Sequence, residues 1–160
     1  MTFYIASGVE NAARVNEAAA VLTKLGHRRT YNWTLHGSVK GAAVQKKQSV
    51  ARVQKKQSVA RLECDGVLSA SLFVLLLPGA KGTHAELGMA LAKASLVSSE
   101  MRVLVWSETS GPFDGTDGFC VFYHHPAVER IVCPFPALLA RLSTIESQEA
   151  ARQRPSTERQ

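Results

Sequence analysis

The sequence predicts a single α/β domain in which a mostly parallel sheet is covered by helices on both faces. Three observations lead to this prediction. The apolar run at Leu72–Leu77 ends at Pro78 and Gly79, as in a central strand that is buried on both faces. Residues from Asn11 to Leu25 are apolar at helical spacing. Short strand-like and helical segments then alternate along the chain, and this alternation implies parallel strands with right-handed crossovers.

The overall composition is that of an ordinary globular protein. The chain has 160 residues, which suits one domain with one core. Its 46% apolar and 20% charged residues lie outside the range of disordered chains. No apolar run approaches the roughly 18 residues of a membrane span, and the N-terminus lacks a signal-peptide pattern. We therefore expect a cytoplasmic protein that does not bind membranes.

The first strand is predicted at Thr2–Ser7, and Gly8 separates it from a helix over Asn11–Leu25. Gly26 follows the last helical turn, where a left-handed cap is favoured. The segment Arg28–Trp33 is rich in Tyr, Trp and Thr, which are residues that strands prefer. It is therefore predicted as the second strand.

The next segment contains a perfect tandem duplication. The nonapeptide VQKKQSVAR occurs at Val44–Arg52 and again at Val53–Arg61. At about 100° per residue, nine residues turn a helix by about half a turn beyond two full turns, so the two copies face opposite ways. We predict that one copy packs on the domain while the other protrudes, frays or loops out. Equal burial of both copies would contradict this prediction.

The third strand is predicted at Leu72–Leu77. Thr83 is expected to cap the following helix, with Glu86 three residues later completing a capping-box spacing, and the helix is expected to extend to about Leu96.

Two more strands are predicted at Arg102–Trp106 and Val128–Cys133, and a last helix at Ala137–Ser147. The elements together describe a three-layer, doubly wound domain of the flavodoxin- or Rossmann-like type with about five mostly parallel strands. We expect this domain to occupy residues 1–148, followed by a disordered polar tail at 149–160.

The net charge of +6 raises the question of nucleic-acid binding. Much of the excess is local, and no aromatic residue is interleaved with it, so a solvated basic helix face is the favoured interpretation. We therefore do not expect a nucleic-acid partner. The basic residues of this segment are Lys46, Lys47, Arg52, Lys55, Lys56 and Arg61.

No metal site or disulfide is expected. The three cysteines are an odd number and have no CxxC or CxxH spacing. His124 and His125 are adjacent, so they point in different directions on an extended chain, and no third ligand is evident.

Three loops follow predicted strands at the edge where open parallel sheets bind ligands: Ala6–Asn11, Tyr31–Gly37 and Pro78–Glu86. The third contains PGAKGTHAELG, in which glycines let the backbone approach a ligand and a helix N-terminus offers free amide groups.

Four segments, FYIASG, YNWT, ECDGV and LLLPGAKGTHAELGMAL, lie in order between Thr2 and Val132. Together they resemble the nucleoside 2-deoxyribosyltransferases and the related nucleotide N-glycosidases. The resemblance implies cleavage or exchange of the N-glycosidic bond of a nucleoside or nucleoside 5′-monophosphate. It also implies a small-molecule partner, no cofactor and a homo-oligomer.

The resemblance also implies catalytic roles. Glu86, in the ELG motif, matches the family's nucleophile, and Tyr4 matches the tyrosine that holds this carboxylate. Glu63 stands where the family usually has an Asp that acts on the base. A carboxylate suits this chemistry, because it can stabilise or capture an oxocarbenium-like centre. Each residue also has a structural interpretation: Glu86 as a helix-capping carboxylate, Tyr4 as a half-buried strand residue, and Glu63 as a solvated one.

The remaining candidates would bind substrate. By resemblance to the nucleotide N-glycosidases, Ser7, Thr83 and His84 are candidates for contact with a 5′-phosphate. Tyr31 and Trp33 are candidates for stacking on a base, and core packing is the alternative for these two aromatic residues. Ala80 stands where the better-known deoxyribosyltransferases carry an Asp that contacts the base, and Cys120 lies near where they place an Asn from a neighbouring subunit, so base recognition is expected to differ. The candidate binding residues are Ser7, Gly8, Tyr31, Trp33, Gly79, Gly82, Thr83 and His84.

Three functions stay open at this point. The first is an N-glycosidase or N-deoxyribosyltransferase, and the second is a nucleotide-binding module without turnover. The third, a basic nucleic-acid-binding protein, depends on the duplicated lysines alone.

Overall fold

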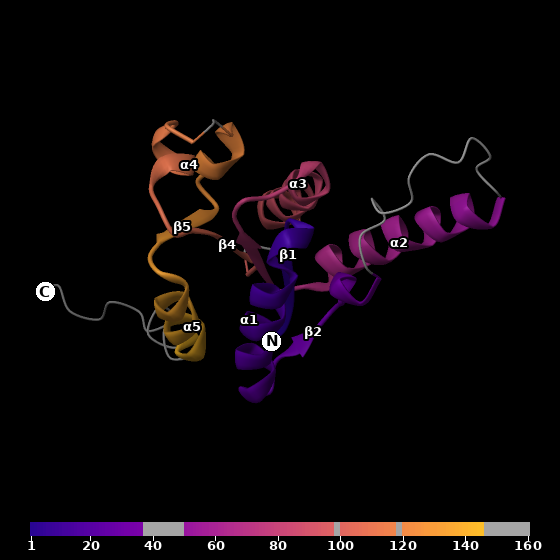
Figure 1. Cartoon of the computed structure of the whole chain (residues 1–160), viewed down its shortest axis with the longest axis horizontal. Coiled ribbons are helices and arrows are strands. Elements are labelled where there is room, and N and C mark those ends of the chain that lie inside the picture. Colours follow the sequence, from indigo (N-terminus) through magenta and orange to yellow (C-terminus); the bar gives the residue numbers. More distant parts are fainter. Residues whose placement is uncertain (37–49, 98–99, 118–119, 146–160) are drawn as a thin grey trace, which may run out of the picture.

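The computed structural model describes residues 1–36, 50–97, 100–117 and 120–145, with residues 50–53 described as backbone only. They form one five-stranded, fully parallel sheet with helices on both faces, which confirms the predicted fold class (Figure 1). The strands are β1 Thr2–Ser7, β2 Arg28–Arg29, β3 Leu72–Leu76, β4 Arg102–Ser107 and β5 Val128–Val132. The α-helices are α1 Ala12–Lys24, α2 Val50–Ser69, α3 Lys81–Leu96, α4 Gly111–Asp114 and α5 Phe135–Ser143. The 3₁₀ turns are η1 Val9–Asn11, η2 Trp33–His36 and η4 Val121–His124.

The strand order is β2-β1-β3-β4-β5, so the chain moves outward from β1 to β2 and then returns to place β3 on the other side of β1. β1 and β3 pair in register from Phe3 with Leu72 to Ser7 with Leu76. The order therefore reverses between β1 and β3, and the loops after these two strands diverge at that point. Open α/β sheets bind their ligands in this crevice.

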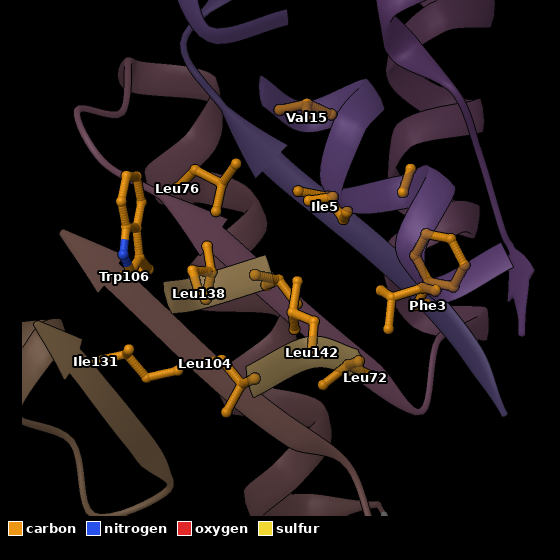
Figure 2. Packing of buried hydrophobic residues seen from close by; sticks show 14 of the residues in the cluster. Phe3, Ile5, Val15, Leu72, Leu76, Leu104, Trp106, Ile131, Leu138 and Leu142 are labelled. Carbon is orange, nitrogen blue, oxygen red and sulfur yellow. The ribbon is translucent and has the colours of Figure 1, made fainter. Parts of the chain in front are cut away.

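Side chains that alternate along the strands form two cores. On one face, α1 and α5 cover Phe3, Ile5, Leu104 and Trp106, all of which are at most 1% exposed (Figure 2). On the other face, α2 and α3 cover the alternate residues of the same strands, among them Tyr4. Because successive strand residues point to opposite faces, the uninterrupted apolar runs of β3 and β4 supply both cores at once.

The prediction of a second strand over Arg28–Trp33 is wrong in its length. β2 contains only Arg28 and Arg29, which pair with Thr2 and Phe3. Beyond β2, the backbone carbonyl of Ile5 on β1 accepts a hydrogen bond from the indole Nε1 of Trp33 at 2.8 Å. At this edge of the sheet, the carbonyl of Ile5 therefore bonds to a side chain and not to a neighbouring strand. The strand propensity of Trp33 does not distinguish these two cases.

The predicted cap of α3 is also wrong. The helix begins at Lys81 with Ala80 as its N-cap, and Thr83 is its third residue. The Thr83 hydroxyl accepts a hydrogen bond from the Ala80 N–H at 3.1 Å, so it satisfies the backbone from inside the first turn. Glu86 lies in the second turn and has a different partner, described below.

α5 begins at Phe135 and ends at Ser143, earlier at both ends than the predicted Ala137–Ser147. Pro136 lies in the first turn, where proline needs no N–H partner, so the helix can start before it. The expected tail at 149–160 lies outside the described residues, and the domain boundary at 148 stays a prediction. Among the helices that the structure describes, none is both long and apolar enough to span a membrane.

The second copy of the nonapeptide lies in α2, which extends away from the sheet (Figure 1). Its side chains from Gln54 to Ser58 are exposed, as are Ala60 and Arg61. This copy therefore protrudes. The first copy lies largely outside the residues that the structure describes, so the predicted difference between the two copies stays a prediction.

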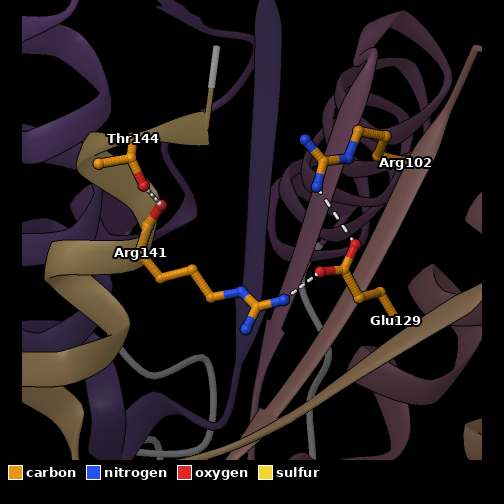
Figure 3. A network of polar contacts seen from close by, with 4 residues as sticks. All are labelled: Arg102, Glu129, Arg141 and Thr144. Atoms are coloured by element: carbon orange, nitrogen blue, oxygen red, sulfur yellow. Dashed lines mark hydrogen bonds and ion pairs between the residues drawn. The ribbon is translucent and has the colours of Figure 1, made fainter. Parts of the chain in front are cut away.

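An ion network joins β4, β5 and α5 (Figure 3). Glu129 accepts hydrogen bonds from Arg102 at 3.2 Å and from Arg141 at 2.5 Å. The Arg102 and Glu129 side chains are only 13% and 21% exposed. By contrast, the side chains of Arg14 and Glu108, which form another ion pair, are 39% and 47% exposed.

These two ion pairs should differ in their effect on stability. We expect Glu129→Ala to lower the free energy of unfolding by about 2–4 kcal/mol, because it leaves the half-buried Arg102 guanidinium unpaired. Glu108→Ala, at the exposed pair, should change it by less than about 1 kcal/mol. Urea unfolding of both variants measures the difference, and equal losses would contradict this account.

Candidate active site

Tyr4 and Glu86 form a buried pair on the α2/α3 face of the sheet. The Tyr4 hydroxyl donates a hydrogen bond to Glu86 Oε1 at 2.5 Å. Tyr4 is fully buried and Glu86 is 8% exposed. Alternation along β1 turns Tyr4 toward α3, and the helical period places Glu86 on the same buried stripe as Leu87 and Ala90. The structure thus brings together two of the three predicted catalytic residues, and Glu86 does not cap the helix.

Burial is the main influence on the Glu86 carboxyl group. The pKa of Glu86 is raised from 4.5 to about 7: burial raises it most, the Tyr4 hydrogen bond lowers it, and the charge of Glu63 raises it. Burial also raises the pKa of the Tyr4 phenol, followed by the charge of Glu86, so Tyr4 stays protonated and acts as the donor. A carboxyl group with a pKa of about 7 can exchange a proton near neutral pH.

Glu63 is the third predicted catalytic residue, and it lies in α2. Its side chain is half-buried, and its charge raises the pKa values of Glu86, Tyr4 and Tyr31. All three groups therefore lie within electrostatic reach of Glu63. Asp65, two residues later in the same helix, is exposed.

The loops after β1 and β3 are joined through Ser7 and Thr83. Thr83 is 4% exposed, and its hydroxyl donates a hydrogen bond to the Ser7 carbonyl at 3.2 Å. The Ser7 hydroxyl donates to the Leu76 carbonyl at 2.7 Å and accepts from Asn11 Nδ2 at 3.0 Å. Ser7 and Thr83, whose hydroxyl groups were predicted to contact a ligand, thus also hold the two loops together.

The loop glycines differ in what surrounds them. A Cβ at Gly79 would lie 3.1 Å from the Thr83 methyl group, so this position is tight, whereas a Cβ at Gly82 would meet nothing within 4 Å. The Gly8 N–H donates to the Pro78 carbonyl at 3.3 Å, which links the same two loops.

His84 lies in the first turn of α3 and contacts Tyr123 of η4. Its Nδ1 is 2.9 Å from the Ala80 carbonyl and its Nε2 is 2.7 Å from the Tyr123 hydroxyl. Because a carbonyl only accepts, Nδ1 carries the proton, and in the neutral ring Nε2 accepts from Tyr123. Burial raises the pKa of Tyr123 to about 12, which keeps this donor protonated.

A pocket of about 240 Å³ lies beside this pair of residues. Glu86 does not line it, although His84 is only two residues away. Cys120 does line it. The lining residues are Leu77, Pro78, Gly79, His84, Pro112, Asp117, Cys120 and Tyr123.

The two aromatic candidates have structural contacts. Trp33 donates its indole N–H to β1 and packs against both cores, as the core-packing alternative predicted. Tyr31 packs against the α2/α3 core, and its Cβ is close to Gly66 of α2.

Two residues of this region were not predicted as site residues. Tyr123 had no signal beyond its neighbouring histidines, because its contact with His84 joins segments 39 residues apart. Gly66 did have a sequence signal, because an isolated glycine inside a helical pattern disfavours the helix and often has a packing reason.

Within the described ranges, no group of three His, Cys, Asp or Glu residues could hold a metal ion. The three cysteines are free thiols.

The raised pKa of Glu86 predicts a pH-dependent stability difference. Its folded pKa lies above the ordinary value, so ionisation destabilises the fold, and stability is lost as the pH rises from about 4.5 to about 7. Glu86→Gln keeps an acceptor for Tyr4 and removes this loss. We expect the variant to gain up to about 3 kcal/mol relative to wild type between pH 5 and pH 8, by urea unfolding. A difference that does not change with pH would contradict the buried, titrating carboxyl; Glu108→Gln is the matched control.

Removal of the Tyr4 donor should act in a defined direction. Tyr4→Phe deletes a hydrogen bond that favours the charged form, so we expect the pKa of Glu86 to rise above 7, by about one unit. Side-chain ¹³C NMR of Glu-labelled protein measures it, with the Glu86 signal assigned by its loss in Glu86→Gln. An unchanged pKa would mean that the hydrogen bond does not form in solution.

Comparison with known proteins gives a match in structure alone. No protein-family model matches the chain, and no curated protein matches it in sequence. Among solved structures, the fold is similar to that of a CMP N-glycosidase of Clostridium botulinum, BcmB, with a TM-score of 0.52 and 16% identity over 89% of this chain and 98% of that one. At this identity the likeness shows the fold: this chain shares its α/β architecture with an N-glycosidase.

Proposed function

We propose that this protein cleaves or exchanges the N-glycosidic bond of a nucleoside or nucleoside 5′-monophosphate, with Glu86 as the nucleophile. The observation that carries the proposal is the hydrogen bond from Tyr4 to Glu86 in a buried position beside the strand-order reversal. A carboxylate held by one oxygen in a low-polarity environment is oriented and poorly solvated. Both properties favour its reaction with a cationic carbon centre.

The Tyr4 hydroxyl occupies Glu86 Oε1, so in this proposal Oε2 is the oxygen that reacts with the anomeric carbon. As the C–N bond breaks, its electron pair goes to the base, and Glu86 stabilises the oxocarbenium-like centre or forms an ester with it. Water, or a second base, then attacks the same carbon and releases the carboxylate. Hydrolysis and transfer thus share the first step and differ only in the second nucleophile.

Glu63 would exchange the proton that the base needs. The departing base takes up a proton, and a carboxylic acid at Glu63 can donate it and later accept one from the attacking water. The charge of Glu63 acts on Glu86, so the two carboxyl groups are near enough to work on one substrate, and this proximity supports the role.

Two further observations support the proposal. The fold is similar to that of a protein described as a CMP N-glycosidase. The loops after β1 and β3, which are candidates for the sugar and phosphate, are tied together by hydrogen bonds of Ser7 and Thr83. A preformed ligand loop needs less ordering on binding. Assembly into a homo-oligomer, which the sequence resemblance implies, stays a prediction.

The test is release of free base from a panel of deoxynucleosides and nucleoside 5′-monophosphates, with and without a second base. We expect turnover of at least one substrate and a loss of about 10³-fold or more in Glu86→Gln, because the nucleophile is replaced by an isosteric amide. Glu108→Gln, an exposed Glu-to-Gln exchange on the other side of the sheet, should retain wild-type turnover.

Release that survives Glu86→Gln would remove Glu86 from the mechanism. If no substrate is cleaved but nucleotides bind, the protein is a nucleotide-binding module, the second function that the sequence left open.

A further inference from the structure

Gly66 marks the closest approach of α2 to the candidate catalytic residues. A Cβ at this position would lie 2.7 Å from Tyr31 Cβ and 3.1 Å from both Cδ2 and Cε2 of the Tyr4 ring. Real Cβ atoms essentially never come within 3.0 Å of another heavy atom. The nearer neighbour is a Cβ next to the backbone, which cannot move aside as the end of a long side chain can. Only glycine therefore fits here with α2 in its present place.

The same helix carries Glu63 one turn earlier. Residues three apart in a helix lie on the same face, so the surface of α2 that touches Tyr4 and Tyr31 at Gly66 is the surface that presents Glu63. Any outward shift of α2 at Gly66 would carry the Glu63 carboxyl group away from the buried Tyr4–Glu86 pair.

The two glycines of α3 show that a helical glycine need not be crowded. A Cβ at Gly88 or Gly82, both in α3, would meet nothing within 4 Å. Glycine disfavours a helix more than any residue except proline, so at Gly66 this unfavourable propensity is accompanied by a specific close contact. Gly88 is thus a matched control for the general effect of a helical glycine.

We propose that Gly66 is a positioning residue: by letting α2 close onto the rings of Tyr4 and Tyr31, it sets the separation between the Glu63 and Glu86 carboxyl groups. The catalytic meaning of this separation rests on the proposed function. The separation itself is a property of the folded protein without substrate, so it can be tested even if the proposed function fails.

The separation has a direct readout in the protonation of Glu86. The titratable groups that act on Glu86 are Tyr4 from β1, which lowers its pKa, and Glu63 from α2, which raises it. Moving Glu63 away should therefore lower the pKa of Glu86, as should neutralising it.

The experiment measures the pKa of Glu86 by side-chain ¹³C NMR in substrate-free protein, for wild type, Gly66→Ala, Glu63→Gln, the double variant Gly66→Ala/Glu63→Gln, and Gly88→Ala. We expect Gly66→Ala and Glu63→Gln each to lower this pKa, and the double variant to lower it no further than Glu63→Gln alone. Gly88→Ala should leave it unchanged.

Two results would overturn the proposal. One is a folded Gly66→Ala variant in which the pKa of Glu86 equals that of wild type. The other is a Gly66→Ala effect that persists undiminished in the Glu63→Gln background, since the change would then come from altered burial of Glu86 and not from the distance to Glu63.

Gly66→Ala can also fail to fold, and a compensating variant covers this outcome. Tyr31→Gly removes the Cβ that lies 2.7 Å from the added methyl group. The combination Gly66→Ala/Tyr31→Gly should then fold better than Gly66→Ala, as measured by urea unfolding, and its Glu86 pKa should lie closer to that of Tyr31→Gly alone. A combination that is no more stable than Gly66→Ala would contradict the steric account.

Base release by the same variants separates this proposal from the proposed function. If wild type releases no base, the proposed function fails, while the pKa comparison still decides the role of Gly66. If wild type turns over, Gly66→Ala should lower kcat more than it raises KM, because it moves the acid/base group and leaves the loops after β1 and β3 in place.

Discussion

The hydrogen bond between Tyr4 and Glu86 lies inside an apolar layer, and the chemistry of the site depends on it. Burial alone would keep the Glu86 carboxyl group neutral, because a charge is poorly stabilised away from water. The phenol supplies one strong donor to the charged form and lowers the pKa, while the charge of Glu63 raises it; together with burial these effects leave the pKa at about 7. A carboxyl group in this balance is available in both protonation states near neutral pH.

The topology of the sheet makes this pair possible. Tyr4 is near the N-terminus and Glu86 is 82 residues later, and they meet because β3 pairs with β1 and α3 then returns over the face to which Tyr4 points. The hydrogen bond of Thr83 to the Ser7 carbonyl fixes the two loops at the same edge. Because each element is held by its core, the site is organised before any ligand arrives.

α2 combines two regions with different surroundings. Its first half holds the second copy of the duplicated nonapeptide, with Lys55, Lys56 and Arg61 exposed to solvent. Its last turns pack against β1 and α3, where Gly66 and Val67 are buried. The second copy therefore lies in the part of α2 that extends away from the sheet, and the packed end of the helix is the part that carries Gly66.

The fold class, the approximate position of every major strand except the end of β2, and the candidates Glu86 and Tyr4 could all be predicted from the order of residues. It could do so because apolar periodicity and glycine-lined turns are local, and because the ELG segment resembles that of a family. The folded arrangement was needed to show that β2 ends after Arg29, that the Thr83 hydroxyl accepts from the Ala80 N–H inside the first turn of α3, and that His84 pairs with Tyr123. It was also needed to show that α2 comes close to Tyr4 at Gly66. These features depend on contacts between segments that are distant in the chain, and no local pattern of residues encodes the distance at which two packed elements meet.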